Sequence, residues 1–178
     1  MLMRSILRTV ALTLAIIVGV GAPSVEAQSL RQALEPFEGA WRGSFVVTTP
    51  DGELVDSLVA THRYRWDGTV QTGTLVDRYP ASGRVDTSHA RNYVADGRLV
   101  CEVTHPDGST TVHYGRVRGN AIVWHRRTEE GVVESYRERV VDTPGGPEYR
   151  IDGFGVYPDG QGARSYVLFY GRYERIAR

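Results

Sequence analysis

Short segments rich in Val, Thr, Tyr and Phe alternate along most of the chain with tight-turn sequences. Asp-Gly and Gly-Asn pairs favour the positive-φ backbone that tight hairpins need. Such pairs, together with one Glu-Gly, recur at Asp51-Gly52, Asp67-Gly68, Asp96-Gly97, Asp107-Gly108, Gly119-Asn120, Glu130-Gly131 and Asp159-Gly160. The repeated strand–turn–strand pattern predicts an antiparallel meander without long helices.

The pattern predicts about ten strands. They cover residues 40–49, 54–66, 69–79, 89–95, 98–105, 109–118, 121–129, 132–143, 148–157 and 163–176. Most connections are short, so consecutive strands should pair in sequence order. Closure of such a meander removes both sheet edges, which predicts an all-β, single up-and-down antiparallel β-barrel with a lumen.

Three other segments complete this outline. Leu34-Glu35-Pro36-Phe37 follows a short polar lead and predicts one turn packed at an end of the barrel. A longer connection runs from Pro80 to Ser88. Asp152-Gly153 lies inside a strand-like run, where it is either a bulge or a further tight turn.

The N-terminus has the layout of a secretory signal peptide. Arg4 and Arg8 precede an apolar run over residues 10–20, and Val25-Glu26-Ala27 resembles a cleavage site. An uncleaved membrane anchor is the alternative, but it usually needs about 20 apolar residues. We therefore predict a leader over residues 1–27, cleaved after Ala27, and one barrel domain over residues 28–178, in a periplasmic or secreted protein without a membrane anchor.

The charged residues argue against a nucleic-acid partner and limit the cationic groups that could contact a ligand. Because Arg4, Arg8 and Glu26 leave with the leader, the mature chain keeps 19 arginines and 20 acidic residues. This near-neutral balance does not fit a nucleic-acid-binding protein. The chain contains no lysine, so any cationic contact to a ligand would come from a guanidinium group.

Cys101 is the only cysteine, which excludes an internal disulfide and makes a structural zinc site improbable. Its place between strand residues predicts a buried thiol.

The turns also predict which side chains share a face. If each turn pair is centred in its hairpin, Trp41, Phe45, His62 and Tyr64 share one side of the wall. In the later strands, one face collects Cys101, Tyr114, Arg116, His125, Arg127, Glu134 and Tyr136. A register shift of one residue would move a strand's set to the other face.

Phe37-Glu38-Gly39-Ala40-Trp41 carries the F-x-G-x-W pattern that opens the first strand of calycins, the lipocalins and fatty-acid-binding proteins. Gly171-Arg172-Tyr173-Glu174-Arg175 resembles the last strand of these barrels, where an arginine packs across the tryptophan. The resemblance implies a barrel end closed by Trp41 against Arg172 or Arg175, and a cavity for a small, largely apolar molecule.

The chain departs from these families in three ways. Only a turn, Pro50-Asp51-Gly52-Glu53, stands where fatty-acid-binding proteins insert two helices. The lipocalin disulfides are absent. Ten strands fit a fatty-acid-binding or nitrobindin-like barrel better, yet no histidine after His125 matches the haem-binding histidine of nitrobindin-like barrels.

Two histidines, His62 and His125, are candidates for the lumen. They would ligate haem or a metal, or bind a ligand headgroup; otherwise they are hydrogen-bonded core residues or lie on the outer wall. His89, His105 and His113 are expected near turns or on the outer wall. No pair of histidines has the spacing of a zinc motif, and we predict no metal site.

The alternating charges Arg116, Arg127, Glu134 and Glu138 leave two alternatives. On an inward face they would form a network that clamps a carboxylate or phosphate. On an outward face they would form a solvated ladder of opposite charges. Ile122 and Trp124 compete for the interior from the other face.

The sequence favours an exported lipocalin-like barrel that binds a small amphipathic or aromatic ligand. Its predicted polar anchors are Tyr114, Arg116, His125, Arg127, Tyr136, His62 and Tyr64, with Trp41 and Arg172 as structural residues. No catalytic residue is assigned, because no G-x-S-x-G elbow is present. Two alternatives remain: an isomerase or cyclase on the same barrel, and a filled barrel that acts through its surface in an envelope complex.

Overall fold

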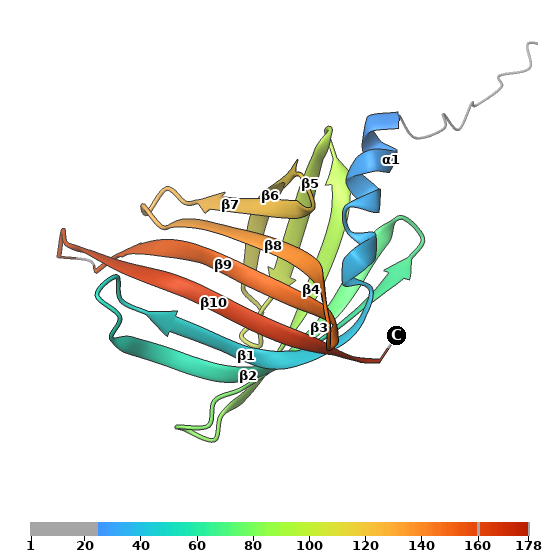
Figure 1. Cartoon of the computed structure of the whole chain (residues 1–178). Coiled ribbons are helices and arrows are strands. Elements are labelled where there is room, and N and C mark those ends of the chain that lie inside the picture. The colour runs from blue at the N-terminus through green and yellow to red at the C-terminus, as the bar shows by residue number, and fades with distance from the viewer. Residues whose placement is uncertain (1–24, 160, 178) are drawn as a thin grey trace, which may run out of the picture.

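The computed structural model describes residues 25–159 and 161–177 and shows a closed antiparallel β-barrel (Figure 1). Its ten strands are β1 (Gly39–Thr48), β2 (Leu54–Asp67), β3 (Val70–Arg78), β4 (Val85–Ala95), β5 (Arg98–Thr104), β6 (Thr110–Arg118), β7 (Ala121–Arg127), β8 (Val133–Thr143), β9 (Gly146–Pro158) and β10 (Arg164–Ala177). Each strand pairs with its neighbours in sequence, and β10 closes onto β1. The predicted up-and-down barrel is confirmed.

Two strands begin at least two residues earlier than predicted. β4 starts at Val85, because the connection before it is a tight turn in which the Tyr79 amide donates to the Arg84 carbonyl at 3.0 Å. β9 starts at Gly146 and continues through Asp152-Gly153, which is neither a bulge nor a turn but pairs regularly on both sides.

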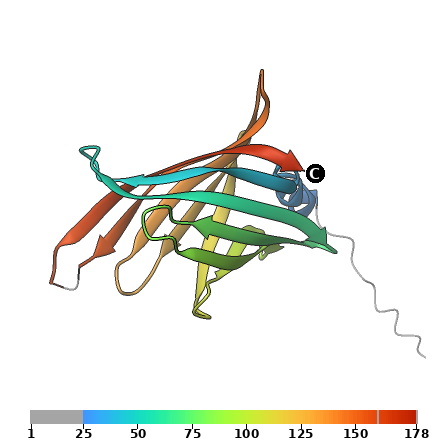
Figure 2. The same ribbon diagram turned by 90° about the horizontal axis from the view of Figure 1, so that it is seen from below.

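A helical segment closes one end of the barrel. Helix α1 (Val25–Gln32) and the 3₁₀ turn η1 (Glu35–Phe37) lie at the end where the C-terminus emerges (Figures 1 and 2). The turn was predicted, but the helix was not, because the sequence places residues 25–27 in the leader and the following residues in a polar lead. The guanidinium of Arg31 in α1 lies over the Trp66 ring at 4.4 Å, and Leu34 and Phe37, which follow α1, are buried in the core. Packing on the barrel end therefore stabilises a segment with a weak helical pattern of its own.

Residues 1–24 of the predicted leader lie outside the described residues. A cleavage after Ala27 would fall inside α1. Among the described residues, no helix has both the length and the apolar character needed to cross a bilayer.

Trp41 anchors the closed end. Its indole Nε1 donates to the Phe37 carbonyl at 2.7 Å, and the guanidinium of Arg175 lies 4.3 Å from its ring centre. The predicted cation–π contact is therefore present, with Arg175 as the partner. The structural role assigned to Arg172 at Trp41 is wrong, because Arg172 is on the opposite side of β10 and donates to the Ile151 and Gly171 carbonyls.

Hairpin loops decide which strand faces point inward. At Asp107-Gly108 the His105 amide donates to the Ser109 carbonyl, so three residues form the loop. The Gly131 hairpin has the same form, closed by Thr128 and Val132. In both loops the glycine comes last and has a positive φ, 83° and 93°, typical of a type I turn followed by a left-handed residue. A three-residue loop shifts the register by one relative to a turn centred on the dipeptide.

That shift reverses the facing of β6 and β7. Cys101 pairs with His113 rather than Tyr114, and Tyr136 pairs with Trp124 rather than His125. Trp124 and Ile122 therefore occupy the interior.

Candidate functional site

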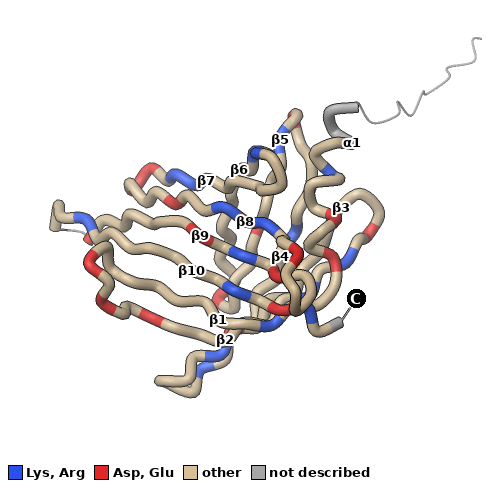
Figure 3. Tube along the Cα trace, in the orientation of Figure 1, with Lys and Arg blue, Asp and Glu red and all other residues tan. Residues whose placement is uncertain are grey.

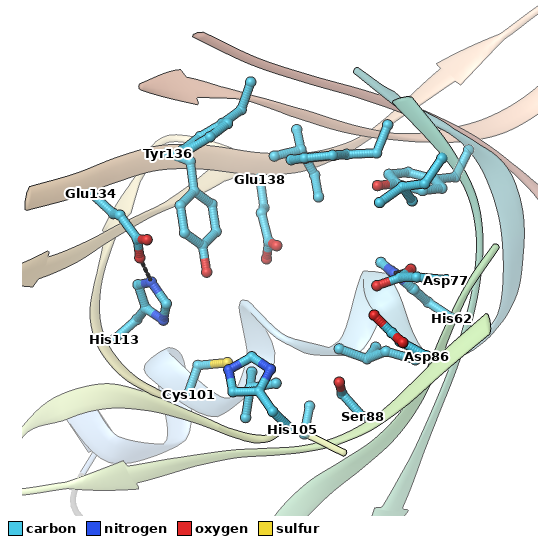
Figure 4. A pocket seen from close by; sticks show the side chains of 18 of the residues that line it. His62, Asp77, Asp86, Ser88, Cys101, His105, His113, Glu134, Tyr136 and Glu138 are labelled. Atoms are coloured by element: carbon cyan, nitrogen blue, oxygen red, sulfur yellow. Dashed lines mark hydrogen bonds and ion pairs between the residues drawn. The ribbon is translucent and has the colours of Figure 1, made fainter. Parts of the chain in front are cut away.

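The barrel encloses a cavity of about 510 Å³ beside its buried core. Its floor is aromatic. The ring centroids of Tyr149 and Tyr173 lie 5.0 Å apart with the rings tilted by 32°, and Tyr149 packs edge-on against Phe37 and Trp41 of the closed end. Tyr79, His105 and Pro106 line it toward the opposite end, where the β3–β4 and β5–β6 loops lie. Figure 4 shows side chains from both walls converging on this space.

Three of the predicted anchors line the cavity, namely His62, Tyr64 and Tyr136. The placement predicted for the other four is wrong: Tyr114, Arg116, His125 and Arg127 lie on the outer wall, and Tyr114 is 51% exposed. These four side chains point outward because the two three-residue loops shift the register of β6 and β7 by one residue. A side chain on the outer wall also cannot ligate a haem in the lumen, so the structure offers no support for that role of His125.

The charged residues divide unequally between the two sides of the wall. Both signs are interspersed along the strands (Figure 3). Among the described residues, however, those that line the cavity include four carboxylates and no arginine. The carboxylates are Asp77, Asp86, Glu134 and Glu138. The carboxylate or phosphate clamp expected from Arg116 and Arg127 is therefore absent from the lumen.

One wall carries a buried carboxylate–imidazole pair. The Nε2 of His113 on β6 lies 2.7 Å from Oε2 of Glu134 on β8 (Figure 4). Tyr157 donates to the other carboxylate oxygen at 2.8 Å, and Arg126 approaches it at 3.4 Å. Burial raises the pKa of Glu134, but the hydrogen bonds from His113 and Tyr157 outweigh it and bring the pKa to about 2. Glu134 is therefore ionised at neutral pH.

Glu138 lies deeper on the same strand. Its two carboxylate oxygens accept hydrogen bonds from Trp124 Nε1 at 2.8 Å and from the Tyr149 hydroxyl at 2.7 Å. Burial raises its pKa, although these two hydrogen bonds act in the opposite direction. Within the described residues it forms no ion pair.

The opposite wall carries His62 and Asp77. His62 Nε2 lies 3.9 Å from Asp77 Oδ1, too far for a hydrogen bond. Burial lowers the pKa of His62 to about 4, so the imidazole is neutral at pH 7. Burial and the nearby Asp86 raise the pKa of Asp77 to about 6. Asp86 itself is paired with Arg84 at 3.1 Å.

Several buried polar atoms around the cavity have no hydrogen-bond partner among the described residues. They are His62 Nδ1, Asp77 Oδ1 and His113 Nδ1. Buried polar atoms are nearly always paired in native proteins, so these three indicate groups that a ligand or water would satisfy.

Cys101 is buried, as predicted, and lines the cavity. Burial raises the pKa of its thiol well above the usual value, so it is a poor nucleophile. In the described part of the chain, no three His, Cys, Asp or Glu side chains are grouped so that they would hold a metal ion.

Sequence reasoning missed His113 and Asp77 as lumen residues. A local signal for His113 was present, because Pro106 precedes Asp107-Gly108. Proline is favoured at the first central position of a type I turn, which indicates the three-residue loop observed here. The same three-residue Pro-Asp-Gly loop joins β1 to β2 at Pro50. There, a register shift between Val47 and Thr48 in β1 compensates for the extra loop residue, so β1 and β2 keep the predicted facing.

No protein-family model matches the chain, and no curated protein matches its sequence. Fourteen chains of solved structures do match it. One is the crystal structure of Rv2717c from M. tuberculosis, with a TM-score of 0.52 and 19% sequence identity, covering 81% of this chain and 96% of that chain. At this identity the similarity shows a shared barrel fold.

Proposed function

We propose that this protein is an exported, calycin-type barrel that binds a small amphipathic or aromatic molecule in its lumen. The observation that carries the proposal is the cavity of about 510 Å³ inside the closed barrel. Small-molecule sites typically occupy about 300–1,000 Å³ and combine apolar walls with a few polar groups.

The lining has this mixed character. Aromatic rings from β8, β9 and β10, including Tyr136, Tyr149 and Phe169, supply apolar surface. The partnerless atoms of His62, His113 and Asp77 supply polar contacts that the protein itself leaves open. A ligand with an apolar body and a polar end would satisfy both.

The cavity also weighs against the filled barrel that acts only through its surface. That alternative requires an interior packed with side chains, whereas a void of this size costs stability unless something occupies it.

The test is a titration with a neutral fluorescent probe, N-(2-hydroxyethyl)dansylamide, after native mass spectrometry has been used to find any co-purified molecule. Ser88 is buried and lines the lumen, whereas its neighbour Thr87 is exposed on the outer wall. We expect one probe per chain, loss of binding in Ser88→Phe, and retention in the matched control Thr87→Phe. Equal binding by a folded Ser88→Phe variant, or absence of binding by this probe and by its cationic and anionic analogues, would overturn the proposal.

An isomerase-type activity is the second candidate, favoured by the His113–Glu134 pair. A carboxylate that accepts a hydrogen bond from the Nε2–H group leaves Nδ1 of His113 with a basic lone pair, which is the arrangement of a general base. His113→Gln should then abolish turnover of a substrate found by ligand screening while changing the affinity for that substrate far less. Unchanged turnover in His113→Gln would exclude this role.

A further inference from the structure

The lumen is acidic although the chain as a whole is neutral. The full chain has 21 basic and 21 acidic residues. Yet the lining of the cavity, within the described residues, contains four carboxylates, three histidines and no arginine. A barrel that bound a fatty acid or a phosphate would need the opposite arrangement, with a guanidinium group directed inward.

Two of the four carboxylates have no arginine partner. Asp86 is paired with Arg84, and Glu134 with Arg126 and His113. Glu138 and Asp77 form no ion pair with an arginine in the described chain.

Glu138 and Asp77 face the lumen from opposite walls, Glu138 from β8 and Asp77 from β3 (Figure 4). A buried carboxylate without a cationic partner is unfavourable, and a bound cation would relieve the cost at both positions.

His62 provides an independent indication of the ligand's chemistry. Its side chain is nine-tenths buried, lines the cavity and has no partner for Nδ1 within the described residues. When Nε2 carries the proton toward Asp77, Nδ1 presents a lone pair, which accepts a hydrogen bond from a donor and repels an anion. A cationic N–H group donates to this lone pair and also neutralises the charge of the carboxylates.

The aromatic lining fits the same chemistry. Tyr64, Tyr136, Tyr149 and Tyr173 surround the inner part of the cavity, and burial raises the pKa of each phenol well above its usual value. These rings therefore stay neutral. The faces of such rings attract cations, and this attraction strengthens when water is excluded.

We infer that the lumen selects a cationic amphiphile, an ammonium group on an apolar or aromatic body, with the ammonium held by Glu138 and Asp77. This inference rests on the proposed ligand-binding function and adds the charge of the ligand. The apolar body would lie against the tyrosine rings, and the ammonium would donate hydrogen bonds to the two carboxylates and to His62 Nδ1.

The test compares three dansyl probes that share one body and differ in charge at pH 7. They are dansyl-ethylenediamine (cation), N-(2-hydroxyethyl)dansylamide (neutral) and dansylglycine (anion). A hydrogen bond to a charged group contributes about 1.5–3 kcal/mol, so we expect the cation to bind about 10- to 100-fold more tightly than the neutral probe. The anion should bind most weakly.

Glu138→Gln and Asp77→Asn keep side-chain size and remove charge. Each should reduce the preference for the cation over the neutral probe by about tenfold and leave affinity for the neutral probe within about threefold. Glu102→Gln, on the outer wall beside Arg91 and Tyr93, is the matched control and should change neither. Circular dichroism verifies that each variant folds.

The outcomes separate the inference from the proposed function. Equal affinity for cation and neutral probe, or tightest binding of the anion, would overturn the inference while ligand binding stands. So would an undiminished preference for the cation in a variant that combines Glu138→Gln with Asp77→Asn. If none of the three probes binds the folded protein, the proposed function fails and the inference fails with it.

Discussion

His113 and Glu134 form a buried pair across the lumen wall, with Nε2 and Oε2 2.7 Å apart. They lie 21 residues apart on β6 and β8, with β7 between those strands. The pair can form only when His113 on β6 and Glu134 on β8 both face the lumen, so it reports directly on the facing of these two strands.

Glu134 makes the barrel sensitive to acid. Its pKa is about 2 in the folded protein and 4.5 in the unfolded chain, so the folded state favours the ionised form. This contribution is present above pH 4.5 and is lost as the pH falls toward 2. We expect Glu134→Gln to lower the free energy of unfolding by about 3 kcal/mol at pH 7, measured by urea denaturation. The free energy of unfolding of this variant should also fall less steeply as the pH is lowered below 4.5. A loss no greater than that of Glu102→Gln would contradict the pairing.

Asp77 should behave in the opposite way. Its pKa is raised to about 6 by burial and by Asp86, with His62 also facing it, so the folded state favours the protonated acid. Its carboxylate destabilises the fold as the pH rises through 6, and the effect is absent below pH 3.8. Asp77→Asn should therefore stabilise the protein by about 1–3 kcal/mol at pH 8 and by almost nothing at pH 3.5. Chemical denaturation at the two pH values checks this; destabilisation at pH 8 would refute it.

The same substitution should weaken binding of the cationic probe. A residue that costs stability and improves affinity is typical of a functional site, where evolution accepts strain that a purely structural residue would not carry.

Arg175 should stabilise the closed end through Trp41. The guanidinium stacks on the indole at 4.3 Å and donates to the Pro36 carbonyl at 2.9 Å. Arg175→Gln should lower the free energy of unfolding by about 1–2 kcal/mol. Arg65→Gln, at an exposed position of β2, is the control and should change it by less than about 0.5 kcal/mol. Equal effects of the two substitutions would show that the stacking contributes nothing.

Gly153 should be essential for strand pairing. A Cβ at this position would lie 2.3 Å from the Ser135 carbonyl oxygen and 2.4 Å from Tyr136 Cβ, so β8 and β9 would have to separate. Gly153→Ala should destabilise the barrel by about 3 kcal/mol or more. Gly145→Ala, in the β8–β9 turn with nothing nearer than 3.7 Å, is the matched control in thermal denaturation. A melting temperature of Gly153→Ala equal to that of the control would contradict the close approach.

The strands, their order and the closure of the barrel were predictable because turn pairs and β-forming runs are local signals. The facing of β6 and β7 was not, because it depends on whether a loop has two or three residues. At Asp96-Gly97 both residues have positive φ, 50° and 70°, as a two-residue turn requires. At Asp107-Gly108 and Glu130-Gly131 only the glycine does, and the sequence dipeptides alone do not show this difference.

The candidate site inherits this division. Tyr136, His62 and Tyr64 were placed correctly in the lumen, since their strands keep the predicted facing. A register shift of one residue places His113 and Trp124 inside the barrel, where the sequence had predicted Tyr114 and His125. Burial of Trp124 and Ile122 favours the observed facing of β7, and the register leaves Arg116 and Arg127 on the outer wall.

The most direct test of the central claim compares tyrosine rings inside and outside the barrel. In a protein with ¹³C-labelled tyrosine rings, titration with dansyl-ethylenediamine should shift the Tyr136 and Tyr149 signals saturably, because both line the cavity. Signals of Tyr114 and Tyr166, which are exposed on the outer wall, should stay unchanged. Shifts at Tyr114 with none at Tyr136 or Tyr149 would place binding on the outer face and contradict a ligand site in the lumen.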